Sequence, residues 1–570
     1  MKTKILSYCL LAGSVLAATS CSDFLTEKPQ GTLTPENYFS NQAELDMSVY
    51  ALYSKVQAFQ CNSNPMIVQC QGDDVTSTTG SNKAAYLSAD AFEVPTDPKG
   101  LEDNWARYYT IIKAANLIID NARKAKTSEA EINIALGQAY YWRAFSYFGL
   151  VRVFGELPMN LTNEPDNNTT PLSSVEDVYN QILADLDAAE KCNLPVKYSG
   201  ANRSINGVNI YVSEQAVKAT QAAVYMAMAG FPLNKTEYYA KAAVAAKQVI
   251  DGVNSGKYPH QLLNDFADVY SYGKNFHSET LLGIDYNSTP GGWSEGDSQL
   301  SSCHQSGKLW SGWGDFLAER RYWASYPEGP RKDATYSKRI LLSNKVAVDW
   351  WATTDGEAYD GKNNAVPDFR PMFVAFSVNQ DDKGQPIAAA FDYTKPVWGG
   401  MCINKRHHLI RYSEVLCWYA ESAARAGGDL TAAKDALKKV RNRAYQDAVK
   451  VSEVDGMNAQ QLADAAYNEH GYEVAGYVLS MVTRRADQFR LDKLKETYDY
   501  RKGGQRDVLV KAGTETHSVD KDGKPFTYRL KADVVVPENM TVTAAWNGNA
   551  SIYHNYPPKE VEKNGNLVRK

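Results

Sequence analysis

The sequence lacks the short motifs that carry most metal and nucleotide chemistry. Its eight cysteines include no Cys-x-x-Cys pair, its eight histidines form no His-Glu-x-x-His motif, and no P-loop lysine motif is present. These absences argue against a structural zinc site, a zinc-protease site and a nucleotide-binding loop. The formal net charge is −5, so the chain offers no basic field to nucleic acid, and nucleic-acid binding is set aside.

Domain-separating linkers are also missing. No Gly/Ser-rich or Pro-rich stretch of any length divides the 570 residues. Length alone would suggest several domains, but without linkers we predict one compound globule with a large core. Together, the 36 Tyr and 11 Trp outnumber the 17 Phe, and such polar-tipped rings suit ordinary cores as well as surfaces that contact hydroxyl-rich ligands.

The N-terminus has the organisation of a secretory signal peptide over residues 1–20. Basic residues at Lys2 and Lys4 precede an apolar run that ends at Ala18, and small residues lead into Cys21. The run is too short to cross roughly 30 Å of hydrocarbon. The pattern resembles the lipobox of bacterial lipoproteins, although Ala18 stands where Leu is usual. The resemblance implies that Cys21 carries a diacylglycerol; the alternative is ordinary cleavage that leaves Cys21 as a thiol.

Apolar residues at helical spacing predict a mostly α-helical fold. The expected helices cover Gln42–Phe59, Leu101–Lys124, Ser128–Phe154, Val175–Cys192, Ser213–Gly230, Glu237–Gly252, Leu409–Gly427, Thr431–Tyr445, Ala459–Asn468 and Glu473–Tyr498. Two helix pairs, Ser213–Ile250 and Tyr412–Ala444, carry Ala and Gly at spacings that let antiparallel helices approach closely. They resemble tetratricopeptide hairpins, and such repeats bury their faces only by stacking.

The helical pattern fails between Gly252 and Leu409. This stretch has strand-like runs at Thr280–Tyr286 and Met372–Phe376 and holds seven of the eleven tryptophans. It is too long for a passive connector, so we predict a ligand-binding insertion over residues 253–408. The flanking helical regions would then be residues 21–252, with an irregular ligand loop at 61–100, and residues 409–570.

The longest recognisable motif runs from Gln138 to Pro158. It reads QAYYWRAFSYFGLVRVFGELP, an aromatic apolar face with an Arg on the polar side and a Gly–Pro stop after Phe154. It is similar to the signature helix of SusD/RagB-like outer-membrane lipoproteins. Four further segments resemble this family: CSDFLTEKPQ from Cys21, Trp105 to Asn116, Arg411 to Ala444, and Tyr556 to Asn564. The stretch Thr483–Asp492 fits the family pattern only in part.

The resemblance implies a tetratricopeptide-like helical scaffold with a large irregular, partly β insertion. It also implies that the protein caps a SusC-like TonB-dependent transporter in the outer membrane and delivers an oligosaccharide to it from the cell surface. In some members the ligand is a peptide, as in RagB-like proteins. No cofactor is implied, and no catalytic residue is needed, so the chain is not expected to be an enzyme.

Sugar capture requires flat aromatic faces and neighbouring polar groups that bond hydroxyls. Trp293, Trp310 and Trp313 stand among Gly and Ser residues in the insertion, and Tyr86 precedes the early helix. The resemblance places the family's ligand aromatics in these two regions, and the alternative for each ring is anchoring its own loop. Asp73 is the polar candidate, with a turn cap after Gly72 as its alternative.

Three further features have alternative interpretations. Gly292–Gly296 matches the G-x-S-x-G elbow of hydrolases, but neither a buried strand directly before it nor a helix after it is predicted. A structural calcium ion could sit in the acidic loops around Asp349–Asp360, which lack EF-hand spacing. Cys61 and Cys70 are near enough in sequence for a disulfide outside the cytoplasm.

Overall fold

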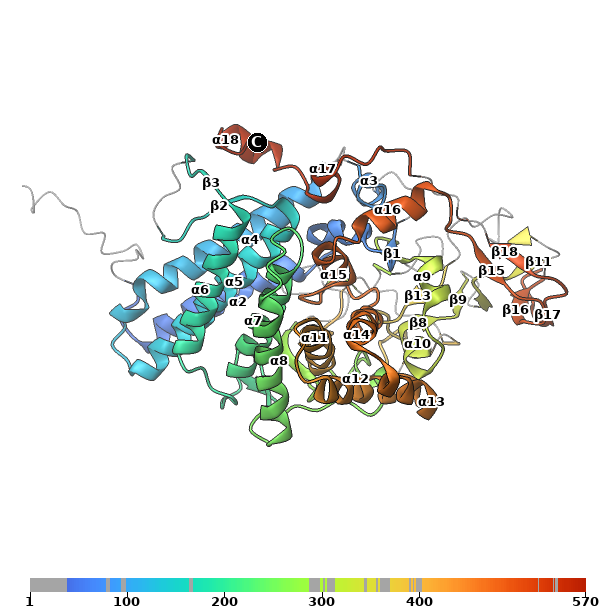
Figure 1. Cartoon of the computed structure of the whole chain (residues 1–570), viewed down its shortest axis with the longest axis horizontal. Helices are drawn as coiled ribbons and strands as arrows, with labels where there is room; N and C mark the ends of the chain where they lie inside the picture. Colours follow the sequence, from blue (N-terminus) through green and yellow to red (C-terminus); the bar gives the residue numbers. More distant parts are fainter. Residues whose placement is uncertain are drawn as a thin grey trace, which may run out of the picture.

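The computed structural model describes residues 38–77, 83–93, 99–163, 168–286, 298–300, 303–304, 313–342, 346–354, 357–358, 370–388, 391–392, 394–395, 402–520, 522–536, 538 and 542–569. Long helices make up the N-terminal part (Figure 1): α2 (Gln42–Gln60), α4 (Lys99–Asn121), α5 (Glu129–Phe154), α6 (Val175–Lys191), α7 (Glu214–Ala229) and α8 (Tyr238–Asn254). Three of these helices have an N-cap side chain: Asn41, Ser128 and Ser174 each accept a hydrogen bond from a first-turn backbone N–H.

The helical scaffold continues after the insertion. Its C-terminal helices are α11 (Tyr412–Arg425), α12 (Leu430–Tyr445), α13 (Ala448–Ser452), α14 (Ala459–Glu473), α15 (Arg484–Arg490), α16 (Leu494–Lys502), α17 (Asn549–Ile552) and α18 (Pro558–Lys563). The hairpin α7/α8 packs on α11, and α11 packs on both α12 and α14. Neighbouring hairpins therefore stack, as predicted for tetratricopeptide-like repeats.

The strands are short and pair only in twos. The pairs are β1 (Val75–Thr76) with β7 (Leu317–Ala318), β2 (Leu157–Pro158) with β3 (Leu172–Ser173), β4 (Ser204–Ile205) with β5 (Val208–Asn209), β6 (Thr280–Ile284) with β14 (His407–Arg411), β8 (Tyr336–Ser337) with β13 (Met372–Phe373), β9 (Arg339–Leu341) with β10 (Ala347–Asp349), β11 (Thr353–Thr354) with β12 (Glu357–Ala358), β15 (Val508–Val510) with β18 (Val534–Val536), and β16 (Glu515–Val519) with β17 (Pro525–Arg529). Among the described residues every such pair is antiparallel.

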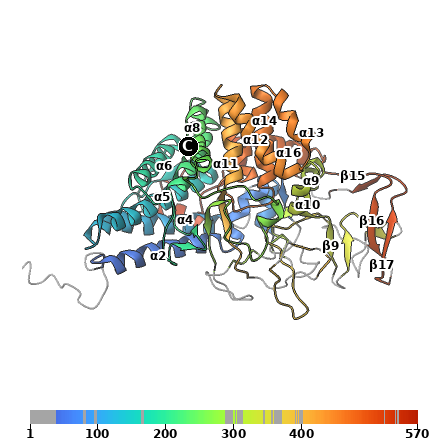
Figure 2. The same ribbon diagram turned by 90° about the horizontal axis from the view of Figure 1, so that it is seen from below.

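Short helices and 3-10 turns fill the irregular regions. They are α3 (Ala84–Asp90), α9 (Arg320–Ser325), α10 (Pro330–Thr335), η1 (Asn64–Gln71), η2 (Ala122–Lys124), η3 (Phe266–Asp268) and η4 (Glu453–Gly456). Figure 2 shows the long helices gathered on one side and the irregular insertion beside them, with β16 and β17 at the far end. The fold is thus mostly α with a partly β insertion, which confirms the predicted fold class.

Two predicted helices are wrong in their bounds. The segment expected to be helical from Leu409 is the strand β14 up to Arg411, because its backbone pairs with β6 before α11 begins at Tyr412. The expected single helix Glu473–Tyr498 is divided into the end of α14, a turn region, α15 and α16. Gly476 stands in that turn region with φ +67°, a conformation that glycine adopts without strain and that ends the helix.

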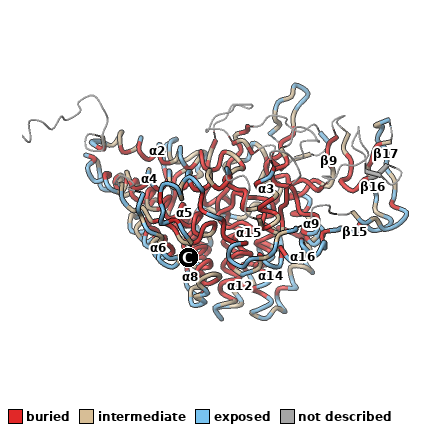
Figure 3. The backbone as a smooth tube through the Cα atoms, turned by 90° about the horizontal axis from the view of Figure 1, so that it is seen from above, coloured by how far each residue is buried: buried red, intermediate tan, exposed pale blue. Residues whose placement is uncertain are grey.

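The signature helix α5 is buried on all sides along residues 141–151 rather than amphipathic there. Every residue from Tyr141 to Val151 is buried, so the expected polar side for its arginine is also wrong. Arg143 instead makes a buried bidentate ion pair with Asp185 of α6, at 2.7 and 2.8 Å. The helix ends at Phe154 as predicted, where Gly155 adopts φ +75°. Figure 3 shows the buried backbone concentrated around α5 and α15, where the scaffold meets the insertion.

Within the described ranges, no helix combines the length and the apolar content that a bilayer crossing requires.

Cys61 and Cys70 are both buried, and they carry thiols rather than a shared disulfide.

Gly230 gives a direct test of the packing between α7 and α15. A Cβ at this position would overlap the Arg490 carbonyl oxygen and lie 2.9 Å from its carbon, and both belong to backbone that cannot rotate away. We expect Gly230→Ala to lower the free energy of unfolding by about 1–3 kcal/mol in urea denaturation. Gly456→Ala is the control, because a Cβ there meets nothing within 4 Å. Equal stability of the two variants would contradict this packing.

Candidate functional site

The predicted ligand loop 61–100 and the insertion meet in space, although the residues in contact are more than 200 positions apart in sequence. Strand β1 pairs with β7, and the Glu319 backbone N–H donates to the Asp74 carbonyl oxygen at 3.0 Å. On the other side of the loop, the Gln299 N–H donates to the Cys61 carbonyl oxygen at 2.6 Å. The two regions that sequence analysis singled out therefore contact each other, and residues 61–76 and 83–86 together with residues 315–319 are called the wall below.

A buried polar cluster fixes that wall in place. Asp315 forms an ion pair with Lys83 and accepts a hydrogen bond from Ser63 Oγ at 2.5 Å. Ser63 Oγ lies 2.8 Å from the hydroxyl oxygen of Tyr86. Lys83 and Asp315 are buried, so this ion pair is shielded from solvent and holds the start of α3 against the strand β7.

Tyr86 lies inside this cluster. Its ring is 5% exposed and makes an edge-to-face contact with Phe316, at 5.7 Å between ring centroids. Burial, together with the charge of Asp315, raises the pKa of the Tyr86 hydroxyl well above its usual value. In this structure the ring anchors the loop, and ligand contact by Tyr86 stays a prediction.

Asp73 lies on the other side of β1, bound to the helix α15. Arg484 donates from Nε and Nη2 to the two carboxylate oxygens, at 2.8 and 2.9 Å, and the Asp73 N–H donates to Gln488. The neighbouring Asp74 is buried and accepts the Gly476 N–H at 2.8 Å. Burial and the charge of Asp73 raise the pKa of Asp74 to about 7. The carboxylate of Asp73 thus has a cationic partner, and its role toward a ligand stays a prediction.

The tryptophans of the insertion fall into separate groups. Trp313 is half-buried, two residues before Asp315, so it lies next to the wall that holds Tyr86. Trp293 and Trp310 lie outside the described residues. Trp350 and Trp351 are buried and pack with Trp323 in a small core of the insertion, with centroid distances of 5.2 to 6.1 Å. Part of the tryptophan enrichment therefore serves packing.

Sequence reasoning missed Ser63, Lys83 and Asp315. None belongs to a motif, and the pairing of Lys83 with Asp315 joins positions 232 apart, which one sequence does not reveal. The glycine at position 314 is a local sequence signal for a change of backbone direction beside Trp313, and in the structure it adopts φ +64°.

No metal site is evident from the described side chains. Among them, no group of three or more His, Cys, Asp or Glu residues is arranged to hold an ion. Asp349, at the start of the predicted calcium loops, accepts the His517 backbone N–H at 2.6 Å. The side chains of residues 353–369 and the elbow Gly292–Gly296 lie outside the described residues.

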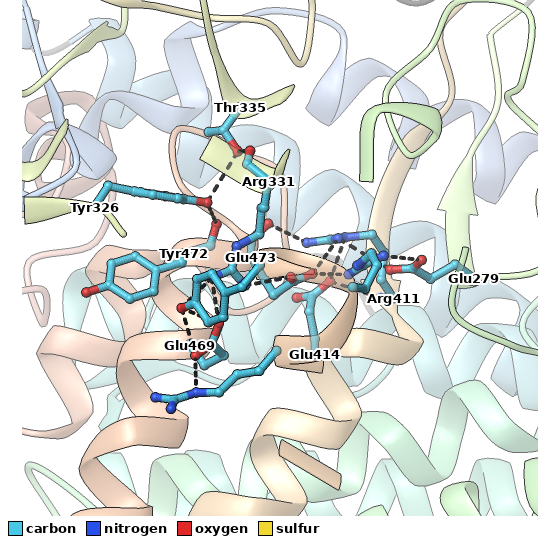
Figure 4. A network of polar contacts seen from close by, with 12 residues as sticks. Glu279, Tyr326, Arg331, Thr335, Arg411, Glu414, Glu469, Tyr472 and Glu473 are labelled. Atoms are coloured by element: carbon cyan, nitrogen blue, oxygen red, sulfur yellow. Dashed lines mark hydrogen bonds and ion pairs between the residues drawn. The ribbon is translucent and has the colours of Figure 1, made fainter. Parts of the chain in front are cut away.

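Behind the wall, a network of buried charges ties the insertion to the helical scaffold (Figure 4). Arg331 of α10 pairs with Glu469 and Glu473 of α14, at 2.5 and 2.8 Å. Glu473 also pairs with Arg411 and Arg443, which lowers its pKa to about 2 although burial alone would raise it. Each of these charged groups lies in an ion pair with another of them, so we assign them a structural role.

Two family models match the chain. One, described as starch-binding associating with the outer membrane, covers residues 23–226, and the other, described as the SusD family, covers residues 374–570. SusD-like protein P25 of Formosa agariphila is 22% identical over 497 residues, which cover 81% of this chain and 86% of that protein. SusD-like protein P2 of the same species is 27% identical over 278 residues, 48% of this chain, and the match spans about half of its length (51%).

Solved structures share the fold. A SusD homolog from Bacteroides thetaiotaomicron has a TM-score of 0.69 at 19% identity, covering 93% of this chain and 97% of that one. A structure solved with a xylogluco-oligosaccharide has a TM-score of 0.63 at 18% identity, covering 92% and 98%. Surface glycan-binding protein A from Bacteroides uniformis has a TM-score of 0.63 at 19% identity, covering 92% and 98%.

Proposed function

Because the chain belongs to the SusD/RagB family, we propose that it is a surface glycan-binding lipoprotein that captures oligosaccharides at the outer membrane. The observation that carries this proposal is the joining of loop 61–100 to the insertion through β1 and β7. That pairing brings the loop with Lys83 next to the segment with Trp313 and Asp315. It supports the proposal because sugar recognition needs rings and polar groups close together.

The proposal also covers the membrane anchor of the protein and its partner transporter. The lipid on Cys21 anchors the chain to the outer membrane, facing outward, and the preceding residues 1–20 are removed. A SusC-like TonB-dependent transporter is the partner that receives the captured oligosaccharide. The protein itself performs no chemistry, because binding and release are sufficient for delivery.

Calorimetry with the protein that lacks the signal peptide tests the ligand class. We expect binding heat with at least one member of a panel of plant and algal polysaccharides and their oligosaccharides. Binding of peptides with no response to any glycan would favour the RagB-like alternative. Turnover of a polysaccharide, measured as released reducing ends, would instead support the hydrolase alternative and contradict the proposal.

The predicted aromatic residues are tested one at a time. We expect Trp293→Ala, Trp310→Ala or Trp313→Ala to weaken binding of the best glycan at least tenfold, about 1.4 kcal/mol, without a change in melting temperature. Phe526→Ala is the control, because Phe526 is 40% exposed on the hairpin β16–β17, which holds no predicted ligand residue. Unaltered affinity in all three tryptophan variants would refute the assignment of these rings to the ligand site.

A further inference from the structure

A small cavity lies at the junction of α5, η1 and the segment that leads into α15. Its volume is about 50 Å³, and most of its lining residues, such as Phe59, Tyr108 and Phe145, are buried. A water molecule needs roughly 10–15 Å³ of such space, so there is room for a single monoatomic ion with one or two waters. Two arginines, Arg152 and Arg485, line this cavity.

Both guanidinium groups hydrogen-bond only to neutral acceptors. Arg152 donates from Nε to the Phe148 carbonyl at 2.8 Å and from Nη1 to the Met481 carbonyl at 2.9 Å. Arg485 donates to the Arg152 carbonyl at 2.8 Å and to the Gln71 side-chain oxygen at 2.8 Å. Neither arginine takes part in any ion pair within 4.0 Å among the described residues.

Nearby carboxylates are already matched with other groups. Asp487 is bound by His470 and Arg490, and Glu414 accepts the Arg411 N–H and the Ser480 hydroxyl. The buried arginines of the neighbouring network, by contrast, each face a carboxylate.

The two guanidinium groups are therefore positive charges without a counter-charge, with Arg485 buried and Arg152 half-buried. Burial and the charge of Arg152 lower the pKa of Arg485 to about 9, and burial lowers the pKa of Arg152. A charge held away from water without a counter-charge raises the free energy of the folded state, and a bound anion offsets this increase.

Unused polar atoms in the same cavity supply the remaining contacts. Gln60 is 2% exposed, yet its side-chain oxygen has no hydrogen-bond partner, and the same holds for the side-chain oxygen of Asn104. A carboxamide such as that of Gln60 can turn its NH₂ toward an anion, whereas Asn104 can accept from a water that also donates to the anion. Arg152 Nη2, which makes no hydrogen bond to another described residue, completes the set of donors.

We propose that this cavity binds a halide ion, chloride under ordinary conditions, held between Arg152 and Arg485. The ion would neutralise the charge at the junction where Arg485 also donates to the Ile552 carbonyl at 3.0 Å. It would thereby join the end of α5, the turn before α15 and the C-terminal segment.

Crystals grown with sodium bromide in place of chloride test the site directly. We expect an anomalous difference peak at the bromine edge inside this cavity, within hydrogen-bond distance of Arg152. A cavity that contains only water, with no anomalous peak at saturating bromide, would overturn the proposal. This experiment uses the unaltered protein, so it does not depend on whether any variant folds.

Melting temperatures provide an independent measurement in solution. The unaltered protein should melt at a higher temperature in chloride or bromide than in gluconate at equal ionic strength, and Arg152→Gln should lose that difference. Arg123→Gln is the control and should keep it, because Arg123 is exposed and pairs with Glu129. The same chloride dependence in all three proteins would contradict a site at Arg152.

Discussion

Replacing Arg331 by Met should lower the free energy of unfolding by about 3–5 kcal/mol. The Arg331 side chain is fully buried, and its guanidinium binds Glu469 and Glu473, whose side chains are also 0% exposed. Without Arg331, these two carboxylates stay buried with one cation fewer, and Tyr445 loses a donor at 3.1 Å. Urea denaturation followed by circular dichroism measures the change.

The position of Arg331 explains why the effect is large. It lies in α10 of the insertion, whereas both glutamates belong to α14 of the scaffold, so one side chain joins the two parts (Figure 4). Arg123→Met is the matched control, because the Arg123–Glu129 pair is exposed and should change stability by at most about 1 kcal/mol. A loss for Arg331→Met as small as that of the control would show that the network does not hold the insertion in place.

The helical scaffold could be predicted from sequence because its signals are local. Asn41, Ser128 and Ser174 cap the helices that they precede, and Gly155 ends α5 where the sequence indicated. The spacing of apolar residues predicted α2 and α4 to α8 with bounds close to the observed ones. Each of these features depends on residues within one or two turns of the chain.

The insertion could not be predicted in the same way, because distant partners decide its structure. Arg411 was expected in a helix, but its segment pairs with β6 through residues more than 120 positions away. The role of Asp315 depends on Lys83 and Ser63, which come from another part of the chain. The glycines beside Trp313 distinguished it from Trp350 in the sequence, but the packing of Trp350 against Trp323 depends on a residue 27 positions away.

The pH dependence of stability should carry a contribution from His470. Its Nδ1 lies 2.5 Å from Asp487, and its Nε2 lies 3.5 Å from Glu414. Burial disfavours the charged ring, but these two carboxylates outweigh burial and raise the pKa of His470 to about 9. In the unfolded chain the pKa is about 6.5. The stabilising contribution is therefore complete below about pH 6.5 and is lost as the pH rises through 9.

We expect the unaltered protein to lose about 3 kcal/mol more than His470→Gln between pH 6 and pH 10, because the glutamine does not titrate. Other groups also titrate in this range. Burial lowers the pKa of Lys405 to about 7, so the contribution of Lys405 to the free energy of unfolding rises with pH. Lys405 is present in both proteins, so the difference between their unfolding free energies isolates His470. Urea denaturation at a series of pH values measures that difference, and parallel curves for the two proteins would show that His470 is not held in its charged form.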